Sequence, residues 1–377
     1  MASQFLDKAL PGVQSLKPYE PGKPISELQR ELGLDDIVKL ASNENPLGPS
    51  PKAQAAMREA LEDLALYPDG NGFDLKRALC EKHGVKPEQI TLGTGSDHIL
   101  ELIARVFLGP GRNAVFSKYG FAIYAIVSQA AGAELRVADA LPEDHPAMPY
   151  GHDLEAMAGQ IDENTRVVFI ANPNNPTGTW VDRATLTAFL DKVPADTLVV
   201  LDEAYYEYVE EADYPDGQTL LANYPNLLVM RTFSKAYGLA GIRVGYGLAS
   251  EEITDLLNRV RLAFHPNTLG QVAATAALAD QAHIDKSIAM NREELAKMQA
   301  GLRERGFKTI PSVCNFVTVD TGRPGREVFQ DLLRQGVIVR PLDGYGMPTH
   351  VRVSVGLPEE NERFFHAFDA VMGSATA

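Results

Sequence analysis

Apolar positions recur with two different periods along the chain from about residue 50 onward. Spacing of three and four residues predicts helices over 54–65, 73–83 and 98–107. Short continuous apolar runs predict strands at 90–92, 114–116, 135–137, 167–171, 198–201, 227–230 and 244–247. Helical patterns lie between many of these runs. Strands that are apolar on both faces are typical of a mostly parallel sheet covered by helices, so we expect an α/β layer.

The pattern changes after about residue 250. A long charged amphipathic helix is predicted over 284–305, with short strands at 315–319, 337–340 and 350–355. Two further helical patterns separate or follow these strands, which indicates a smaller α+β unit. The first 40 or so residues carry several prolines and one helical stretch near 25–31. We therefore predict an N-terminal arm over 1–45, a large domain over 46–270 and a small domain over 271–377.

Composition limits the class of protein. The 377 residues are 45% apolar and 23% charged, which excludes a disordered chain, a collagen and a small disulfide scaffold. The net charge of −15 disfavours nucleic acid and anionic membranes as partners, because their phosphates would be repelled. Cys80 and Cys314 form no CxxC pair, and no apolar run approaches the roughly 18 residues of a membrane span. We expect a cytoplasmic protein without a signal peptide.

The segment 231–247, RTFSKAYGLAGIRVGYG, carries the strongest chemical pattern. A hydroxyl-rich turn follows an apolar strand and presents Lys235, which lies among Phe, Ala, Tyr and Leu residues. A desolvated lysine loses its proton more easily and can act as a nucleophile. Thr232, Ser234 and Arg243 offer two hydroxyls and a guanidinium, which suit a phosphate. An ordinary surface lysine in a loop is the alternative interpretation of Lys235 alone.

Three other segments place polar residues after apolar strands. Asp202 follows one strand, with Tyr205 three residues later, and Asn175 lies in a turn-rich segment after another. The carboxyl ends of such strands are where α/β proteins bind ligands. The sequence GTGSD at 93–97 precedes a helix, whose N-terminus suits an anion, but it lacks the pattern of a dinucleotide or Walker loop. A helix N-cap is an equally good interpretation of Asp202 alone.

Together and in this order, the motifs resemble the fold-type I aminotransferases that use pyridoxal 5′-phosphate. The resemblance rests on NPTG at 175–178, DEAY at 202–205 and SKAYGLAGIR at 234–243. Three further segments are similar to the histidinol-phosphate aminotransferase family: KLASNENPLGPSP at 39–51, YPDG at 67–70 and VRVSVGLPEEN at 351–361. The resemblance covers most of the chain. It implies a large domain with a mostly parallel sheet of the seven-stranded type between helices, plus a smaller α+β domain.

The resemblance also implies roles around the cofactor. Lys235 is expected to form the Schiff base with pyridoxal phosphate and to move the substrate proton. Asp202 would pair with the ring nitrogen, and Asn175 and Tyr205 with the phenolic oxygen of the ring. The aromatic residue that stacks on the ring is matched by Tyr119, with Phe121 as the alternative. The remaining implied contacts reach the phosphate: the backbone amides of Ser96 and Asp97, and the side chains of Thr232, Ser234 and Arg243.

On the substrate side, Arg352 matches the arginine that binds the α-carboxylate of the amino donor and can also meet a substrate phosphate. Arg340 is expected to be a second anion contact, with a solvated cation on a strand as the alternative. Tyr19 and Asn43 match substrate-facing positions, although Tyr19 could simply anchor the arm. Tyr67 matches a tyrosine that reaches the cofactor phosphate of the neighbouring subunit, which implies a homodimer with shared active sites.

The activity implied by the resemblance is an exchange of an amino group between L-histidinol phosphate and 2-oxoglutarate. The products would be imidazole acetol phosphate and glutamate, in a ping-pong reaction of histidine biosynthesis. Three alternatives remain open: an aromatic amino-acid aminotransferase, a decarboxylase of a phosphate-bearing substrate on the same fold, and a non-catalytic binding protein. The eight histidines form neither HxxxH nor HExxH, so we predict no metal site.

Overall fold

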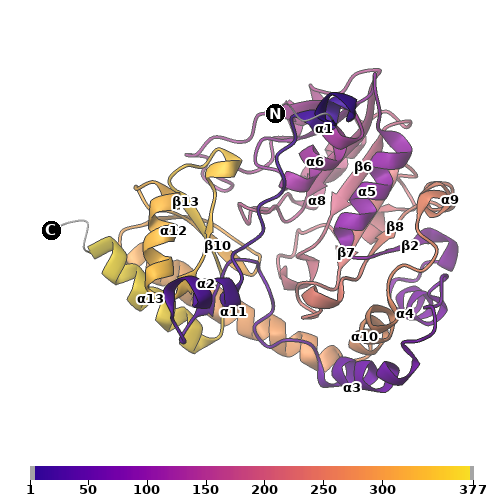
Figure 1. The fold of residues 1–377 in the computed structure, drawn as a ribbon. Coiled ribbons are helices and arrows are strands. Elements are labelled where there is room, and N and C mark those ends of the chain that lie inside the picture. The colour runs from indigo at the N-terminus through magenta and orange to yellow at the C-terminus, as the bar shows by residue number, and fades with distance from the viewer. Residues whose placement is uncertain (1–4, 374–377) are drawn as a thin grey trace.

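The computed structural model describes residues 5–373, and these residues form three sheets (Figure 1). The largest sheet has seven strands in the order β2-β8-β7-β6-β5-β3-β4. They are β2 (Ile90–Gly93), β3 (Asn113–Ser117), β4 (Glu134–Ala138), β5 (Thr165–Ala171), β6 (Leu198–Asp202), β7 (Leu227–Thr232) and β8 (Gly245–Leu248). Only β8 runs antiparallel to its neighbours. The predicted α/β class with a mostly parallel seven-stranded sheet is confirmed.

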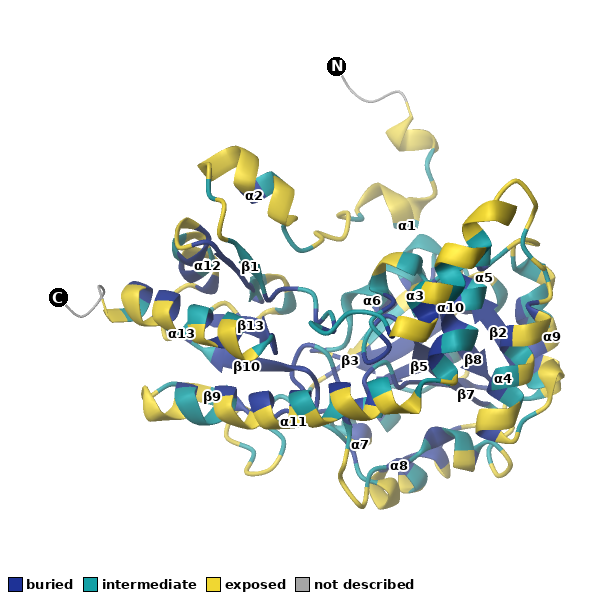
Figure 2. Cartoon of the chain, turned by 90° about the horizontal axis from the view of Figure 1, so that it is seen from below, coloured by how far each residue is buried: buried dark blue, intermediate teal, exposed yellow. Residues whose placement is uncertain are grey.

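Helices cover both faces of this sheet, as expected for strands that are buried on both faces. Val199 and Leu201 of β6 pack into one core, and Leu198 and Val200 into the other. The first core is covered by α3 (Pro51–Ala60), α4 (Phe73–His83), α7 (Leu154–Ala158), α8 (Arg183–Leu190) and α10 (Thr268–Leu278). The second is covered by α5 (Ser96–Phe107), α6 (Ala122–Ala130) and α9 (Glu251–Val260). In Figure 2 the buried strands lie between helices whose outer faces are exposed.

A smaller sheet forms the C-terminal part. Its order is β12-β13-β10-β9, all antiparallel, with β9 (Lys308–Ile310), β10 (Phe316–Asp320), β12 (Arg340–Pro341) and β13 (His350–Ser354). The helices α12 (Gly325–Arg334) and α13 (Pro358–Gly373) share its core. The long helix α11 (Gln281–Glu304) contributes Ile284 to the core of the large sheet and Met298 to that of the small one.

The arm connects the two parts on the side of the pocket described below. Its first helix, α1 (Pro11–Gln14), lies against α6, where Gln129 donates to the Ser15 hydroxyl at 2.9 Å. Its second helix, α2 (Ile25–Leu32), buries Leu28 beside Ile338 of the small part. The strand β1 (Val38–Lys39) then pairs with β11 (Val337–Ile338). The three domain boundaries remain predictions, and residues 1–4 and 374–377 lie outside the described residues.

Several element boundaries differ from the sequence prediction. The helix predicted at 54–65 begins at Pro51, capped by Ser50, and ends at Ala60 in a 3₁₀ turn. The strand predicted at 337–340 is two short strands in different sheets, β11 and β12, and β9 was not predicted. The short 3₁₀ helices are η1 (Leu6–Lys8), η2 (Leu61–Asp63), η3 (Pro87–Gln89), η4 (Tyr206–Tyr208), η5 (Gly217–Leu220), η6 (Ala240–Ile242) and η7 (Asp343–Tyr345).

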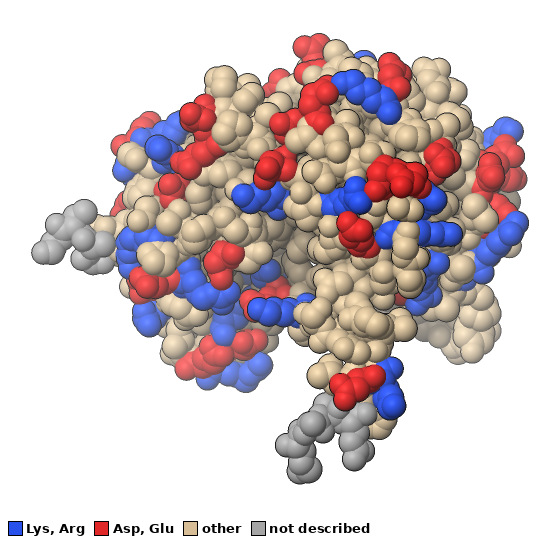
Figure 3. All heavy atoms as spheres, turned by 90° about the horizontal axis from the view of Figure 1, so that it is seen from above, with Lys and Arg blue, Asp and Glu red and all other residues tan. Residues whose placement is uncertain are grey.

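The surface carries both signs of charge. Figure 3 shows Lys and Arg side chains interspersed with Asp and Glu over the face that it displays. Many of these charges form exposed pairs, such as Arg259 with Asp255 and Lys297 with Glu293, one helical turn apart. Among residues 5–373, no helix combines the length and apolar content that a membrane crossing requires.

Candidate active site

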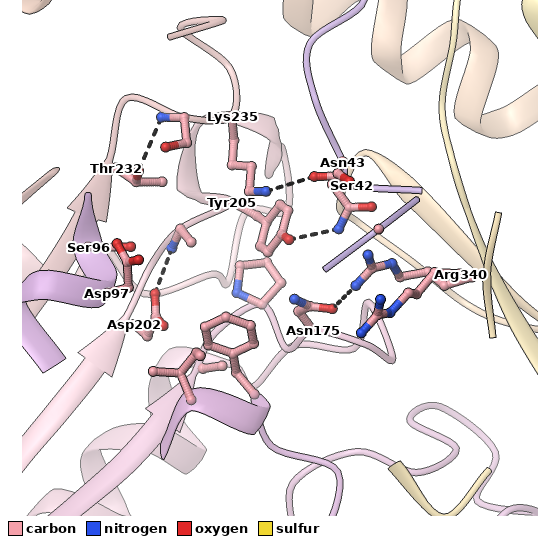
Figure 4. Close-up of a pocket in the computed structure, with 18 of the residues that line it drawn as sticks. Ser42, Asn43, Ser96, Asp97, Asn175, Asp202, Tyr205, Thr232, Lys235 and Arg340 are labelled. Carbon is pink, nitrogen blue, oxygen red and sulfur yellow. Dashed lines mark hydrogen bonds between the residues drawn. The ribbon is translucent and has the colours of Figure 1, made fainter. Parts of the chain in front are cut away.

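A pocket lies where the carboxyl ends of β5, β6 and β7 face the arm and the small sheet (Figure 4). It is therefore at the edge where parallel α/β sheets bind ligands. Thirteen of the fifteen site residues predicted from the sequence line it. They are Tyr19, Asn43, Ser96, Asp97, Asn175, Asp202, Tyr205, Thr232, Ser234, Lys235, Arg243, Arg340 and Arg352. Figure 4 shows Lys235 between Ser96 and Asp97 on one side and Arg340 on the other.

Lys235 is carried by the turn that follows β7. Its Nζ donates to the backbone carbonyl of Ser42 at 3.1 Å and lies 5.6 Å from the centre of the Tyr205 ring. Burial, and after it the nearby guanidinium of Arg352, lowers the pKa of this amine to about 8. A lysine with such a pKa supplies the neutral amine near physiological pH, which a nucleophile needs.

Asp202 ends β6 with its carboxylate in the floor of the pocket. Its Oδ1 accepts from the backbone N–H of Ala204 at 3.2 Å, and its Oδ2 accepts from the Tyr124 hydroxyl at 2.7 Å. Burial raises the pKa of this carboxyl to about 6, and the Tyr124 bond opposes that rise. Asp202 is therefore mostly ionised at neutral pH and can hold a proton on a basic ring nitrogen. Tyr124 lines the pocket and was not predicted, because no motif contains it.

One end of the pocket is built to receive an anion. Helix α5 begins here without any side chain capping its first N–H groups, which leaves those of Ser96 and Asp97 available. Arg243 donates to the Ser234 hydroxyl at 3.2 Å and to Asp97 Oδ1 at 2.8 Å. Gly95 makes room for this guanidinium, since a Cβ there would lie 2.2 Å from Arg243 Nη2. These donors fit the phosphate of pyridoxal phosphate.

Gly245, at the start of β8, allows a second close backbone contact with the first turn of α5. A Cβ on Gly245 would lie 2.5 Å from the backbone nitrogen of Ser96, so only glycine lets the strand touch the start of α5. Arg243 adopts a left-handed backbone conformation with φ of 62°, two residues before this glycine. The conformation directs the arginine at the helix N-terminus rather than along the strand.

The opposite end of the pocket carries two guanidiniums. Arg352, on β13, is buried and donates to the Ala41 carbonyl at 2.8 Å and to Asn175 Oδ1. Its Nε has no hydrogen-bond partner within the described part of the chain. Arg340, on β12, lies 5.4 Å from the centre of the Tyr19 ring. Among residues 5–373, neither arginine forms an ion pair with a carboxylate, so both can receive an anionic ligand.

Asn43 links the arm to both sheets. Its amide donates to the Tyr205 hydroxyl at 2.8 Å, and its carbonyl oxygen accepts from the Ser354 hydroxyl at 2.8 Å. Its backbone carbonyl accepts from Asn315 at 2.9 Å. The Tyr205 hydroxyl therefore accepts one hydrogen bond from Asn43 and keeps its own proton to donate into the pocket.

Tyr119 is not among the residues that line the pocket, and its predicted stacking on the cofactor ring remains a prediction. The Tyr119 ring packs edge-on against Tyr150 at 5.3 Å, in a cluster with Ile310. The residue lies in a tight turn in which the Gly120 N–H donates to the Ser117 carbonyl at 2.7 Å. The alternative residue, Phe121, lines the pocket.

Tyr67 is also absent from the lining of this pocket. It is 79% exposed and stacks on Phe264, with ring centres 4.3 Å apart and planes inclined by 18°. The predicted role of Tyr67 concerns a neighbouring subunit, and it remains a prediction. Its stacking on Phe264 nevertheless fixes the direction in which the exposed ring projects from the molecule.

The fold and this lysine-centred pocket define an aminotransferase: the chain belongs to the aminotransferase class I and II family, whose model matches residues 35–368. It is 57% identical over 377 residues to histidinol-phosphate aminotransferase 2 of Pseudomonas fluorescens, with 100% of both chains covered. Identity to the histidinol-phosphate aminotransferase 2 of Methylococcus capsulatus is 55% over 365 residues, 97% of this chain and 98% of that one.

A solved structure is similar over nearly the whole chain. The histidinol-phosphate aminotransferase of Sinorhizobium meliloti, in complex with pyridoxal 5′-phosphate, has a TM-score of 0.88 at 31% identity and covers 97% of both chains. The family predicted from the sequence is therefore confirmed.

Proposed function

We propose that the protein is a pyridoxal-phosphate-dependent histidinol-phosphate aminotransferase of histidine biosynthesis. It exchanges an amino group between L-histidinol phosphate and 2-oxoglutarate, giving imidazole acetol phosphate and glutamate. The observation that carries the proposal is the arrangement of cations around the Lys235 amine. Arg243 and the start of α5 lie at one end of the pocket, and Arg340 and Arg352 at the other. One end suits the phosphate of the cofactor, and the other suits an anionic substrate.

Pyridoxal phosphate, when bound, supplies an aldehyde that takes up the amino group and a ring that accepts electrons. The residues of the chain do the rest. The Lys235 amine would hold the aldehyde carbon of the cofactor, with release of water, and would carry the proton that leaves the substrate carbon. The Asp202 carboxylate holds the proton on the ring nitrogen. Tyr205 donates its hydroxyl proton to the ring oxygen, and Asn175, whose carbonyl oxygen is held by Arg352, offers its amide nitrogen to the same atom.

The two substrates share an anionic group but differ in its geometry. A guanidinium binds either a carboxylate or a phosphate through a fork of donors, so Arg352 can receive both. Arg340 is placed to receive a second anionic group, the distal carboxylate of glutamate or the phosphate of histidinol phosphate. Tyr19 lines the pocket beside Arg340 and Phe121, with its ring centre 6.5 Å from that of Phe121.

We further propose that the protein is a homodimer. Large apolar side chains close in sequence to Tyr67 or to its stacking partner Phe264 are exposed: Leu61, Leu64, Leu66, Phe73, Leu262 and Phe264 itself. Exposed apolar side chains of this size are typical of a surface that a second copy covers, and such a contact would bring Tyr67 to the cofactor phosphate of the partner. Sedimentation equilibrium tests this, with a dimer expected and a monomer at micromolar concentration contradicting it. A cytoplasmic location is proposed as well, in keeping with two cysteines that are free.

The activity is tested by comparing kcat/KM for histidinol phosphate and phenylalanine, each with 2-oxoglutarate. We expect histidinol phosphate to be strongly preferred, and equal or higher efficiency with phenylalanine would indicate an aromatic aminotransferase instead. Release of carbon dioxide without consumption of the keto acid would indicate a decarboxylase. Lys235→Ala should abolish turnover, and Lys235→Arg, which keeps the charge, should do the same. Near-normal turnover in either variant would refute the role of Lys235.

A further inference from the structure

Tyr124 is the one aromatic hydroxyl that reaches Asp202 within the described residues. It lies on α6, is fully buried and donates to Asp202 Oδ2 at 2.7 Å. Its ring stacks on Phe169 with centres 4.9 Å apart and planes inclined by 3°, and it meets the Phe121 ring edge-on at 5.8 Å. The two rings hold the phenol in one position, so the hydroxyl is aimed at the carboxylate rather than free to rotate away.

The surroundings of this hydrogen bond are apolar. Tyr124 belongs to the core formed by α5, α6 and the large sheet, where a hydroxyl without a partner would be costly. Burial raises the pKa of Tyr124 well above its ordinary value, so the phenol keeps its proton and acts only as a donor. A phenylalanine would fill almost the same space and avoid the cost of burying the hydroxyl. Packing alone therefore does not explain why position 124 carries a tyrosine rather than a phenylalanine.

We propose that Tyr124 is a positioning residue, whose hydroxyl orients the Asp202 carboxylate and keeps it ionised for the ring nitrogen of pyridoxal phosphate. The proposal rests on the proposed function, from which it takes the role of Asp202. The Tyr124 hydroxyl donates to Asp202 Oδ2, and the Ala204 N–H uses only one of the lone pairs of Oδ1. Oδ1 is thereby left with lone pairs for the proton of the ring nitrogen.

Other groups also face Asp202, and they act more weakly. Burial is the largest influence and favours the neutral acid. Against it, the Tyr124 bond lowers the pKa of Asp202 more than the Ala204 N–H does, and the charge of Lys235 contributes least. Tyr205 directly precedes η4, and its pKa is raised mainly by burial, so it stays neutral and adds no charge. Removing the Tyr124 hydroxyl therefore removes the main group that opposes burial.

The test uses the cofactor-free protein and measures the dissociation constant of pyridoxal phosphate from pH 5.5 to 8.5. Binding should weaken in two steps as pH falls, because the Lys235 amine takes up a proton near pH 8 and the Asp202 carboxylate near pH 6. In Tyr124→Phe we expect binding at pH 7 to be weaker by a factor on the order of 10 to 100, as for loss of a hydrogen bond to a charged group. The midpoint of the lower step, which belongs to Asp202, should also move upward by about one unit.

Tyr246→Phe is the matched control. Tyr246 is as deeply buried, and its hydroxyl pairs with His83 Nε2 at 2.9 Å instead of with Asp202. The control should lose some thermal stability but keep the wild-type pH midpoint. An equal loss of affinity in both variants with an unmoved midpoint would overturn the proposal, because the role of Tyr124 would then be structural only. Wild-type affinity in Tyr124→Phe would overturn it as well.

Two further variants make the result specific. In the Asp202→Asn background, Tyr124→Phe should cost no additional affinity if Tyr124 acts through Asp202; a full additional loss would contradict that. Site-specific 3-fluorotyrosine at position 124 keeps the shape of the tyrosine side chain, and its hydroxyl is a stronger hydrogen-bond donor. The pH midpoint that belongs to Asp202 should therefore move downward. This test remains available even if Tyr124→Phe does not fold. If Asp202→Asn itself had no effect on cofactor binding, the proposed function would be at fault rather than Tyr124.

Discussion

Replacing Gly95 by alanine tests how the anion-binding end of the pocket is built. Gly95 has a φ of 82° and precedes α5, in a backbone conformation that is almost restricted to glycine. A Cβ at this position would lie 2.2 Å from both Arg243 Nη2 and Asp97 Oδ1. Both atoms are at the ends of flexible side chains, so they can move aside and the fold can survive. The guanidinium would then leave the place where the phosphate binds.

The expected effect has two separable parts. Backbone strain should lower the free energy of unfolding by about 1–3 kcal/mol. Displacement of Arg243 should remove hydrogen bonds to a charged group, each contributing about 1.5–3 kcal/mol. The second part weakens binding of pyridoxal phosphate roughly 10- to 150-fold, at about 1.4 kcal/mol for each factor of ten. Pyridoxal, which has no phosphate, should bind to the variant and the wild type with nearly equal affinity.

The assay compares dissociation constants of pyridoxal phosphate and pyridoxal for the cofactor-free protein. Gly111→Ala is the matched control, because Gly111 also has a positive φ, of 77°, but a Cβ there would meet nothing within 4 Å. The control should lose stability and keep its affinity for both ligands. If Gly95→Ala weakened pyridoxal as much as pyridoxal phosphate, or weakened neither, the assignment of the phosphate to this end of the pocket would be refuted.

Three further predictions concern buried or unpaired charges. Glu203→Ala removes the carboxylate that lies 2.7 Å from the buried guanidinium of Arg231, and should lower the free energy of unfolding in urea by about 3–5 kcal/mol. The double variant Glu203→Leu with Arg231→Met should lose far less stability. An equal loss in both would contradict the argument that the unpaired charge is what destabilises the protein. Arg340→Gln should raise KM for histidinol phosphate about tenfold or more, without weakening cofactor binding; an unchanged KM would make Arg340 a solvated cation. Covalent capture of pyridoxal phosphate by cofactor-free protein should speed up as pH rises through about 8, because only the neutral Lys235 amine reacts. Arg352→Gln should move that midpoint upward, and a wild-type midpoint near the ordinary 10.5 would contradict the burial argument.

The large sheet could be predicted from the sequence because its strands are buried on both faces. The runs in β5, β6 and β7 are almost wholly apolar, and the polar residues that matter come where these runs end. Asp202 is the last residue of β6, and Lys235 follows the end of β7. The position of these residues at one edge of the sheet then follows from the parallel direction of the strands.

The sequence did not reveal the features that depend on contacts between residues far apart in the chain or on very short elements. β9 has three residues, of which only Ile310 is buried, so no periodicity reveals it. Both Tyr119 and Phe121 are plausible stacking residues in the sequence, and only the three-dimensional packing shows that Phe121 lines the pocket. Tyr124 is 78 positions away from Asp202 along the chain, and their contact follows from the packing of α6 on the sheet rather than from any local pattern.

The arm forms part of the pocket wall only through contacts with residues that are synthesised much later. Asn43, which holds the Tyr205 hydroxyl, is itself held by Ser354, 311 positions later in the chain. At roughly 5–20 residues per second, a ribosome needs about 15 to 60 s to make the intervening segment. The wall of the pocket therefore remains incomplete until translation is nearly finished. During that time Asn43 lacks the Ser354 hydroxyl that fixes its side chain against Tyr205.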